Sequence, residues 1–410
     1  MSGETQQASS KYPPVKLYIR MPSGLIPLDE KTEALALPQN PAFDDPRISY
    51  GPYLRAVAGY FSANSCRRLK DLLAKTGSPV PPLGCAEAIT LVSEKHGALY
   101  SVSRLQVRFA RRDGINPSTS LAPALSFAVN TAFLPGQKAF LAVEYRLLRQ
   151  LFRRFHPAGL PRAYLSGMTR MRTEDGALAL DLFAAEWFEN HHEFHLSRTG
   201  PDMAGRALRI NVWKPGHDQL FLDERQTGEL FAGAARILTA CFDTRAFKQI
   251  YPWHHGAGDF IVDDGRSPVS VRLVTARDYR SLLPPGSDTG YKMLGALHFF
   301  ANLSIRMRID RLDGTGEPAW AGAEVLPGVI RGFCEAWKTK ELENVELPEA
   351  VEMLSFFLRL SPGERLEFCE IAARDGRVEA EETGFLEGRL PEHVRELSAA
   401  IEEHIQSCDD

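Results

Sequence analysis

His254, His255 and Asp259 are the side chains best suited to chemistry in one short run of this sequence. They stand in YPWHHGAGDFIV, residues 251–262, with the aspartate directly before an apolar triplet. Imidazole exchanges a proton near neutral pH, so a histidine here can serve as a general base. Aspartate is a poor strand former, and its place before an apolar run indicates a role for its side chain or for a turn. The composition is compatible with a metal site, a catalytic loop or an unusual bend, and all three residues are catalytic candidates.

A second histidine-rich run, NHHEFH, contains His191 and His195, which stand four residues apart. On a helix this spacing puts two imidazoles on one face, as metal ligands do. His191, His195 and His254 are therefore an alternative set of ligands for a transition metal, with Glu193 or Asp259 available to complete the site. The competing interpretation is that each histidine bonds to backbone groups.

Composition limits the classes of protein to which the chain can belong. It has 410 residues, of which 44% are hydrophobic and 24% charged, enough apolar material for a large core in two or three structural units. A formal net charge of −4 provides no global field for nucleic acid or an anionic membrane, so neither is an expected partner. No apolar run approaches the roughly 18 residues of a membrane span, and MSGETQQASS lacks a signal-peptide core, which predicts a cytoplasmic protein. Six scattered cysteines without a C-x-x-C pair argue against a zinc ribbon or a disulfide scaffold.

The histidine runs must be positioned by elements that the hydrophobic pattern predicts. In chain order we expect a disordered or extended segment over 1–50, a helix over 53–75, a hairpin over 88–109, a strand over 125–133, a helix over 137–155, strands over 161–171 and 177–188, a helix over 222–243, strands on either side of a turn at 265–268, and helices from about residue 290 to the end. Asp223 and Gln226 have the spacing of a capping box at the start of the helix over 222–243. The last helices, over 341–410, form an appendage whose apolar stripes pack onto the main body or onto a partner protein.

This order of elements resembles the protein-kinase-like fold, in its aminoglycoside phosphotransferase or choline kinase branch, over roughly residues 85–340. The resemblance implies an α+β protein of two lobes, with an antiparallel sheet and one main helix over 51–187 and a mostly helical part over 188–340. It also implies ATP and Mg²⁺ as cofactors, a lysine on the third strand that pairs with a helix glutamate, and a loop that supplies a catalytic aspartate and a metal-binding asparagine.

Four residues of the first part take the cofactor-binding positions of this resemblance. Asn130, in FAVN, stands where the lysine belongs, and Glu144 stands where the helix glutamate belongs. Glu144 shares a predicted helix face with Phe140 and leucines, so its carboxylate is expected to point inward. Glu186 and Phe188 fall in the segment that meets the adenine ring. Together with the 186–195 linker and the 251–262 run, these residues are expected to line one cleft.

The catalytic positions depart from the family pattern. Asp259 takes the place of the metal-binding asparagine, His254 that of the catalytic aspartate and Arg272 that of a second metal-binding aspartate. Without the lysine and both acids, most of the electrostatic stabilisation of phosphoryl transfer is lost. The sequence therefore predicts a pseudokinase or an atypical nucleotide-dependent transferase, with a histidine-based metalloenzyme or a non-enzymatic interaction scaffold as alternatives.

A further charged run, RMRIDRLDGTGEP at 306–318, packs arginines and aspartates closely together. It can form an anion-binding corner, but we expect a network of surface salt bridges.

Overall fold

The computed structural model of this protein describes residues 12–38, 48–77, 79–97, 99–110, 124–156, 159–173, 176–199, 208–216, 219–255, 258–284, 289–343, 347–376 and 382–409. The predicted tail over 1–11 and the proline-rich stretch over 39–47 lie outside these residues. The described chain is a mixed helix and strand structure, which confirms the α+β class. No helix in the described ranges is long and apolar enough to cross a membrane.

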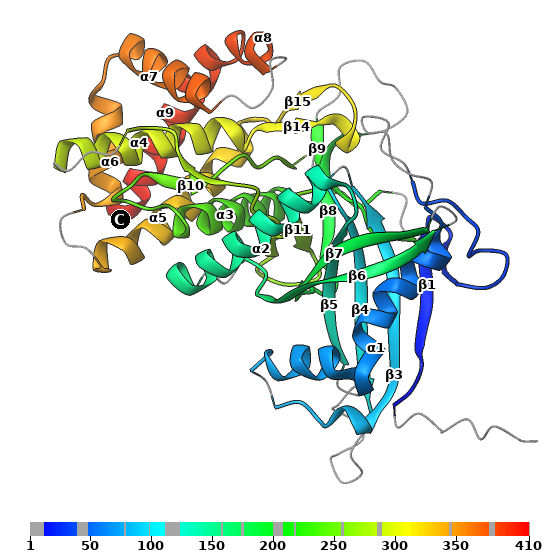
Figure 1. The fold of residues 1–410 in the computed structure, drawn as a ribbon. Coiled ribbons are helices and arrows are strands. Elements are labelled where there is room, and N and C mark those ends of the chain that lie inside the picture. The colour runs from blue at the N-terminus through cyan, green and yellow to red at the C-terminus, as the bar shows by residue number, and fades with distance from the viewer. Residues whose placement is uncertain are drawn as a thin grey trace, which may run out of the picture. The chain divides into compact units, whose positions relative to one another are not determined.

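The chain divides into two units (Figure 1). Unit 1 comprises Met1–Arg146 and Arg162–Glu189, and unit 2 comprises Leu147–Pro161 and Asn190–Asp410. The helices over 341–410, expected as an appendage, therefore belong to unit 2.

Unit 1 is built on a seven-stranded sheet of order β2-β1-β3-β4-β5-β7-β6. Its strands are β1 Val15–Met21, β2 Gly24–Pro27, β3 Ala86–His96, β4 Ser101–Phe109, β5 Ala124–Ala132, β6 Ala163–Thr173 and β7 Gly176–Glu186. The predicted hairpin and three further strands are present, but the sheet is mixed because β1 runs parallel to β3. Residues 15–21 and 24–27, within the segment over 1–50 that was expected to be disordered or extended, are extended and form the strands β1 and β2. There Leu17 pairs with Leu91, and Ile19 is fully buried in the core.

Helix α1, Tyr50–Ala74, covers one face of this sheet. The Tyr53 hydroxyl lies 3.0 Å from Ser103 Oγ and 2.8 Å from Thr131 Oγ1, which ties the helix to β4 and β5. The helix is interrupted at Ala63–Cys66, where Asn64, Ser65 and Cys66 have positive φ.

Helix α2, Pro135–Phe155, meets the opposite face of the sheet through Tyr145, and its residues from Leu147 onward belong to unit 2. Phe183 on β7 is the cross-strand neighbour of Asn130 on β5, so the two side chains share a face. The Tyr145 ring on α2 lies 5.8 Å from the Phe183 ring on this face. Glu144 is buried as predicted, at 4% exposed, but Phe140, placed on the same stripe, is 52% exposed because the helix buries a face centred away from it.

Unit 2 contains a four-stranded sheet of order β12-β11-β8-β9. Its strands are β8 His192–Arg198, β9 Leu208–Val212, β11 Phe260–Asp263 and β12 Ser270–Leu273, and two smaller ladders join β10 Lys248–Ile250 to β13 Tyr279–Ser281 and β14 Ile309–Arg311 to β15 Pro318–Trp320. The strands β11 and β12 were predicted. The remaining strands were not, because three-residue strands carry no periodicity and NHHEFH has little strand-like alternation.

The helices of unit 2 are α3 Glu224–Ala240, α4 Thr289–Arg306, α5 Leu326–Glu343, α6 Ala350–Arg359, α7 Pro362–Asp375, α8 Glu382–Glu387 and α9 Leu390–Asp409, with 3₁₀ turns at Leu312–Gly314 and Ala323–Val325. The predicted capping box of α3 is confirmed: Gln226 N–H donates to Asp223 Oδ1 at 2.7 Å, and Asp223 N–H donates to Gln226 Oε1 at 3.1 Å. In α9, Leu390, Val394, Leu397 and Ile401 are buried, so this stripe packs within unit 2.

Candidate functional site: a buried histidine and carboxylate cluster in unit 2

Asp259 ends the loop that leads into β11, and its carboxylate is almost fully enclosed. The residue is 1% exposed. Its Oδ2 accepts a hydrogen bond from His254 N–H at 2.8 Å, and its Oδ1 accepts one from Arg277 Nη2 at 2.5 Å. Gly258 precedes it with φ +67°, and a Cβ there would lie 2.7 Å from the Glu193 carboxyl carbon, so only glycine fits this turn. Asp259 therefore links Arg277 to the loop that holds His254 and His255, called the histidine loop below.

His255 lies in the aromatic core of unit 2. It is 2% exposed, and its ring centroid lies 5.4 Å from that of Phe194, 5.7 Å from Phe231, 5.6 Å from Trp253 and 5.4 Å from Phe260. Neither ring nitrogen has a hydrogen-bond partner among the described residues. Burial lowers the pKa of His255 to about 4, so the ring is neutral at pH 7. This residue packs as an aromatic side chain.

His254 is partly buried beside three guanidinium groups. Burial lowers its pKa to about 3, and the positive charges of Arg306, Arg311 and Arg277 act in the same direction. An imidazole with so low a pKa is a weak base at pH 7. Burial and these positive charges together keep the His254 ring neutral at pH 7.

His195 on β8 stands between two carboxylates. It is 1% exposed, and its Nδ1 lies 3.6 Å from Asp310 Oδ1 while its Nε2 lies 4.0 Å from Glu193 Oε2. Asp310 in turn accepts hydrogen bonds of 2.7 Å from the backbone N–H groups of Leu196 and Arg311. The carboxylate of Asp310 therefore fixes the place of β14 beside β8.

The charged run over 306–318 is not the surface network that its composition suggested. Arg306, Arg308 and Asp310 are each 2% exposed. Arg308 donates to Ala321 O at 2.8 Å and to Glu396 Oε2 at 2.6 Å. The prediction of surface salt bridges is therefore wrong for residues 306–310, whereas residues 315–317 are exposed and Glu317 pairs with Arg198 at 2.7 Å.

The transition-metal set His191, His195 and His254 is not assembled as a metal site. Residues 192–198 form a strand, so positions four apart are separated by about 13 Å instead of one helical turn. His191 Nε2 lies 3.1 Å from Ser270 Oγ. Over the described stretches no group of three or more His, Cys, Asp or Glu side chains is arranged to hold a metal ion.

A buried serine and histidine pair elsewhere in unit 2 has a structural role. Arg308 can only donate, so at 3.3 Å it requires His393 Nδ1 to be the acceptor. The Nε2–H of His393 then donates to Ser304 Oγ at 3.1 Å, and that hydroxyl donates to Ala301 O at 2.9 Å. The proton that a nucleophilic serine would give to histidine is therefore directed to a backbone carbonyl, and the pair holds α9 against α4.

The cofactor-binding candidates of the first half lie in unit 1. Asn130 is 8% exposed on β5, and Glu144 of α2 is 4% exposed. Glu186 ends β7, where its Oε2 accepts from Arg162 N–H at 3.4 Å. Phe188 follows the end of β7 and is partly exposed.

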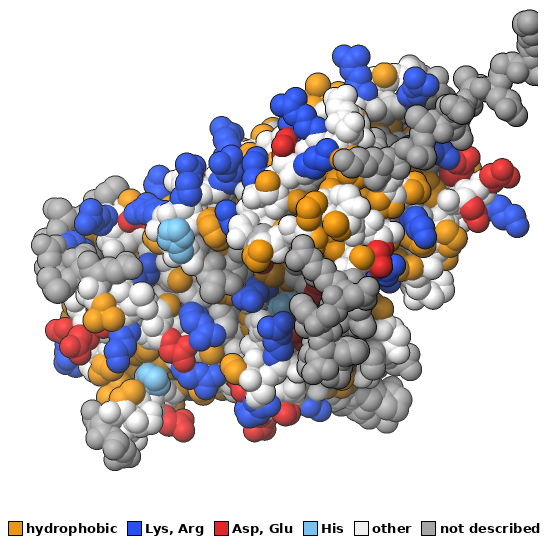
Figure 2. Space-filling view, turned by 90° about the horizontal axis from the view of Figure 1, so that it is seen from below, with side chains coloured by type: hydrophobic (Ala, Val, Ile, Leu, Met, Phe, Trp, Pro, Cys, Tyr) orange, Lys and Arg blue, Asp and Glu red, His pale blue; other side chains and the backbone are white. Residues whose placement is uncertain are grey.

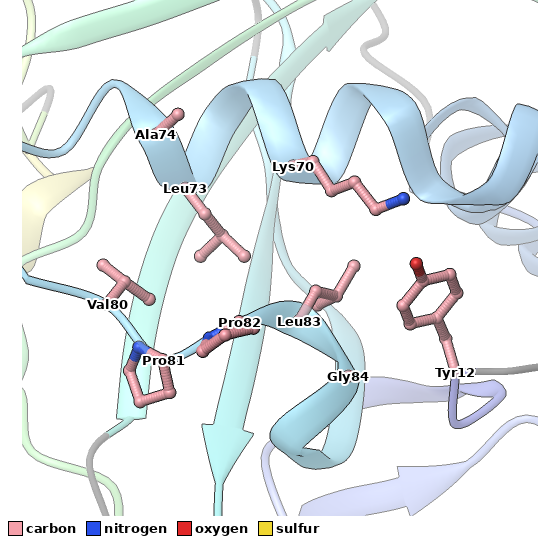
Figure 3. Close-up of a pocket in the computed structure, with 9 residues that line it drawn as sticks. All are labelled: Tyr12, Lys70, Leu73, Ala74, Val80, Pro81, Pro82, Leu83 and Gly84. Carbon is pink, nitrogen blue, oxygen red and sulfur yellow. The ribbon is translucent and has the colours of Figure 1, made fainter.

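A pocket of about 450 Å³ in unit 1 contains none of the predicted site residues (Figure 3). It lies between α1 and the segment at 80–84, and its lining is mostly apolar, with Leu73, Val80 and Leu83. Its cation is Lys70, whose Nζ lies 4.8 Å from the centre of the Tyr12 ring. Lys70 and Tyr12 are the titratable side chains of its lining, which includes no carboxylate, histidine or cysteine.

Sequence reasoning found Asp259 and its histidines but missed Arg277, and it placed Arg306 and Asp310 in a surface salt-bridge network. These three residues contact segments that are distant in the sequence, and no local sequence pattern predicts such contacts. Neither a protein-family model nor a curated protein sequence matches this chain.

Proposed function

We propose that this protein is a pseudokinase: a kinase-like protein that binds a nucleotide without Mg²⁺ and transfers no phosphoryl group. The observation that carries the proposal is the clamp on Asp259, whose carboxylate is bonded to Arg277 and to the His254 backbone. Phosphoryl transfer needs carboxylate or amide oxygens open to Mg²⁺. An aspartate held in a buried ion pair is poorly suited to that task.

The strand order of unit 1 supports the kinase-like part of the proposal. Leaving aside β1 and β2, its strands run β3-β4-β5-β7-β6, with α2 inserted in the chain between β5 and β6. A hairpin, a third strand, a helix and two further strands in one sheet is the arrangement that the resemblance implies for the smaller lobe. Helix α2 covers the face on which Asn130 lies.

The residues on that face support nucleotide binding without ordinary catalysis. Asn130 replaces a lysine, and an amide can bond to a phosphate oxygen but adds no positive charge. Glu144 is buried on α2, as the helix glutamate of the resemblance would be. A buried helix acid together with an uncharged side chain at position 130 supports nucleotide binding without phosphoryl transfer.

The histidine at the expected position of the catalytic base also argues against transfer. A pKa of about 3 leaves His254 neutral at pH 7, and its basicity is too low to accept a hydroxyl proton efficiently.

The test measures nucleotide binding and phosphate release on the full chain. We expect ATP alone to raise the melting temperature, because a ligand that binds only the native state stabilises it by about 2.7 kcal/mol at a hundred times its Kd. Adding Mg²⁺ should not increase the shift. We expect no release of phosphate from ATP above the level of Asp259→Asn.

A matched control for this variant is Asp263→Asn, since Asp263 is also a buried aspartate on β11 and pairs with Arg266 at 2.8 Å. ATP turnover that is lost in Asp259→Asn but kept in Asp263→Asn would refute the proposal in favour of an active transferase. A melting shift that appears only when Mg²⁺ accompanies ATP would contradict it too, and so would no shift with ATP.

A further inference from the structure

Helix α2 turns an unusually basic face to solvent. Its 21 residues contain Lys138 and four arginines, and its one acidic residue, Glu144, is buried. The exposed arginines at 146, 149 and 153 repeat at helical spacing, so they lie on one side of the helix. Arg146 and Arg153 have no ion-pair partner among the described residues, and each bonds to a carbonyl of its own helix. Figure 2 shows Lys and Arg side chains gathered along one edge of the face in view, with few acids among them.

Strand β6, at the edge of the unit 1 sheet, carries further exposed arginines. Met168, Arg170 and Arg172 alternate along β6 and are exposed. They share a sheet face with Phe183, because Ser166, two positions before Met168, is the cross-strand partner of Phe183. The Phe183 ring contacts Tyr145 of α2, so β6 shows these side chains on the side of the sheet that carries α2.

Apolar side chains are exposed within the same surface. Phe140 is 52% exposed and Val143 39% exposed on α2, and Met168 is 58% exposed on β6. Val143 stands three residues from both Phe140 and Arg146, so this end of the helix offers apolar and cationic side chains together. A nucleic-acid duplex is bound mainly through its phosphates by cations and does not need exposed Phe, Val and Met side chains. A bilayer with anionic headgroups uses both kinds of side chain.

The net charge of the whole chain does not indicate this basic surface, because the charges are distributed unevenly along the sequence. Residues 341–410 contain 19 acidic and 6 basic side chains, whereas residues 1–340 contain 33 acidic and 42 basic ones. The formal charge of −4 is thus the sum of a strongly acidic C-terminal region and a basic remainder. An inference drawn from the total charge alone does not apply to the α2 face.

We propose that the surface formed by Phe140, Val143 and Arg146 of α2 and by Met168, Arg170 and Arg172 of β6 docks the protein onto an anionic phospholipid bilayer. The guanidinium groups contact lipid phosphates, to which arginine can bond through two N–H groups. The apolar side chains enter the boundary between headgroups and acyl chains. The protein binds as a peripheral protein, with no spanning segment.

The test is co-sedimentation of the full chain with vesicles of phosphatidylcholine alone and with vesicles that also contain phosphatidylglycerol. Binding is expected only with phosphatidylglycerol, and it should weaken as salt increases. The triple variant Arg146→Gln, Arg170→Gln, Arg172→Gln should bind about a hundredfold more weakly, at about fivefold per arginine. The charge-matched control Arg67→Gln, Arg108→Gln, Arg395→Gln changes exposed arginines outside this surface and should bind as the native protein does.

A second variant, Phe140→Ser with Met168→Ser, keeps every charge and separates a bilayer from other polyanions. It should weaken vesicle binding severalfold while leaving the salt dependence unchanged. Equal binding of the triple variant and its control, equal binding to both vesicle types, or no binding to vesicles would overturn the proposal. The proposal would also be overturned if neither the native protein nor the triple variant bound vesicles and the triple variant lost duplex DNA binding or self-association that the native protein shows.

Discussion

Replacing Asp259 by asparagine tests the contact on which the proposed loss of catalysis depends. Asp259 is 1% exposed, and the Arg277 side chain is 24% exposed. The change removes the negative charge from a largely buried ion pair and weakens the acceptor of His254 N–H. Breaking one side of a buried pair costs about 3–5 kcal/mol, and the partial exposure of Arg277 favours the lower end. We expect Asp259→Asn to lose about 3 kcal/mol of unfolding free energy.

The double variant Asp259→Asn with Arg277→Leu measures the coupling of the two residues. Because each single variant leaves the other group without its partner, the double variant should lose less than the sum, by about 2 kcal/mol. Urea unfolding followed by tryptophan fluorescence is the assay, since Trp253 is buried beside the histidine loop. Additive losses, or a single-variant loss below about 0.5 kcal/mol, would show that Asp259 is not clamped and is open to other ligands.

The remaining predictions concern packing and pH. His393→Phe removes the acceptor of Arg308 and should cost about 2–3 kcal/mol of unfolding free energy, measured by urea titration. The folded pKa values of His255 and His393, about 4 and about 3, lie below the unfolded value of 6.5, so the unfolded state binds more protons in acid. The free energy of unfolding should therefore be constant above about pH 6.5 and fall as the pH drops toward 4. The variant His255→Phe should make this fall with pH less steep. An equally steep fall in the variant would contradict the pKa assigned to His255. Gly332→Ala places a Cβ 2.1 Å from Ala232 O between α5 and α3 and should cost about 1–3 kcal/mol or more, whereas Gly136→Ala, which meets nothing within 4 Å, should be neutral or stabilising in the same titration.

Local patterns in the sequence were enough to locate most elements of unit 1 and the main helix of unit 2. The hairpin at 88–109, the strand at 125–133 and helices α1 and α2 follow from alternating or helical spacing of apolar residues. The capping box at Asp223 and Gln226 follows from a four-residue motif. Each of these features depends on neighbours in the chain, and a pattern of neighbours can be recognised without a fold.

The candidate site was predicted only in part. The run around His254 and Asp259 identified the loop, and burial of Glu144 followed from its helix stripe. The metal set is not brought together because the strand β8, His192–Arg198, begins directly after His191 and contains His195, and this strand forms through pairing with β9 and β11. The strands β9 and β11, whose pairing gives this segment its extended conformation, lie further along the sequence.

The sequence by itself determined the periodic elements, their caps and the chemical types available in the histidine loop. Only the tertiary structure decided that Asp259 meets Arg277, that His255 is enclosed by aromatic rings and that the run beginning at Arg306 is buried. The reason is physical: the charge state and reactivity of these groups depend on desolvation and on the partner across the contact. Desolvation and the contact partner are both set by packing between segments that are distant in the sequence. A local sequence pattern therefore does not reveal them.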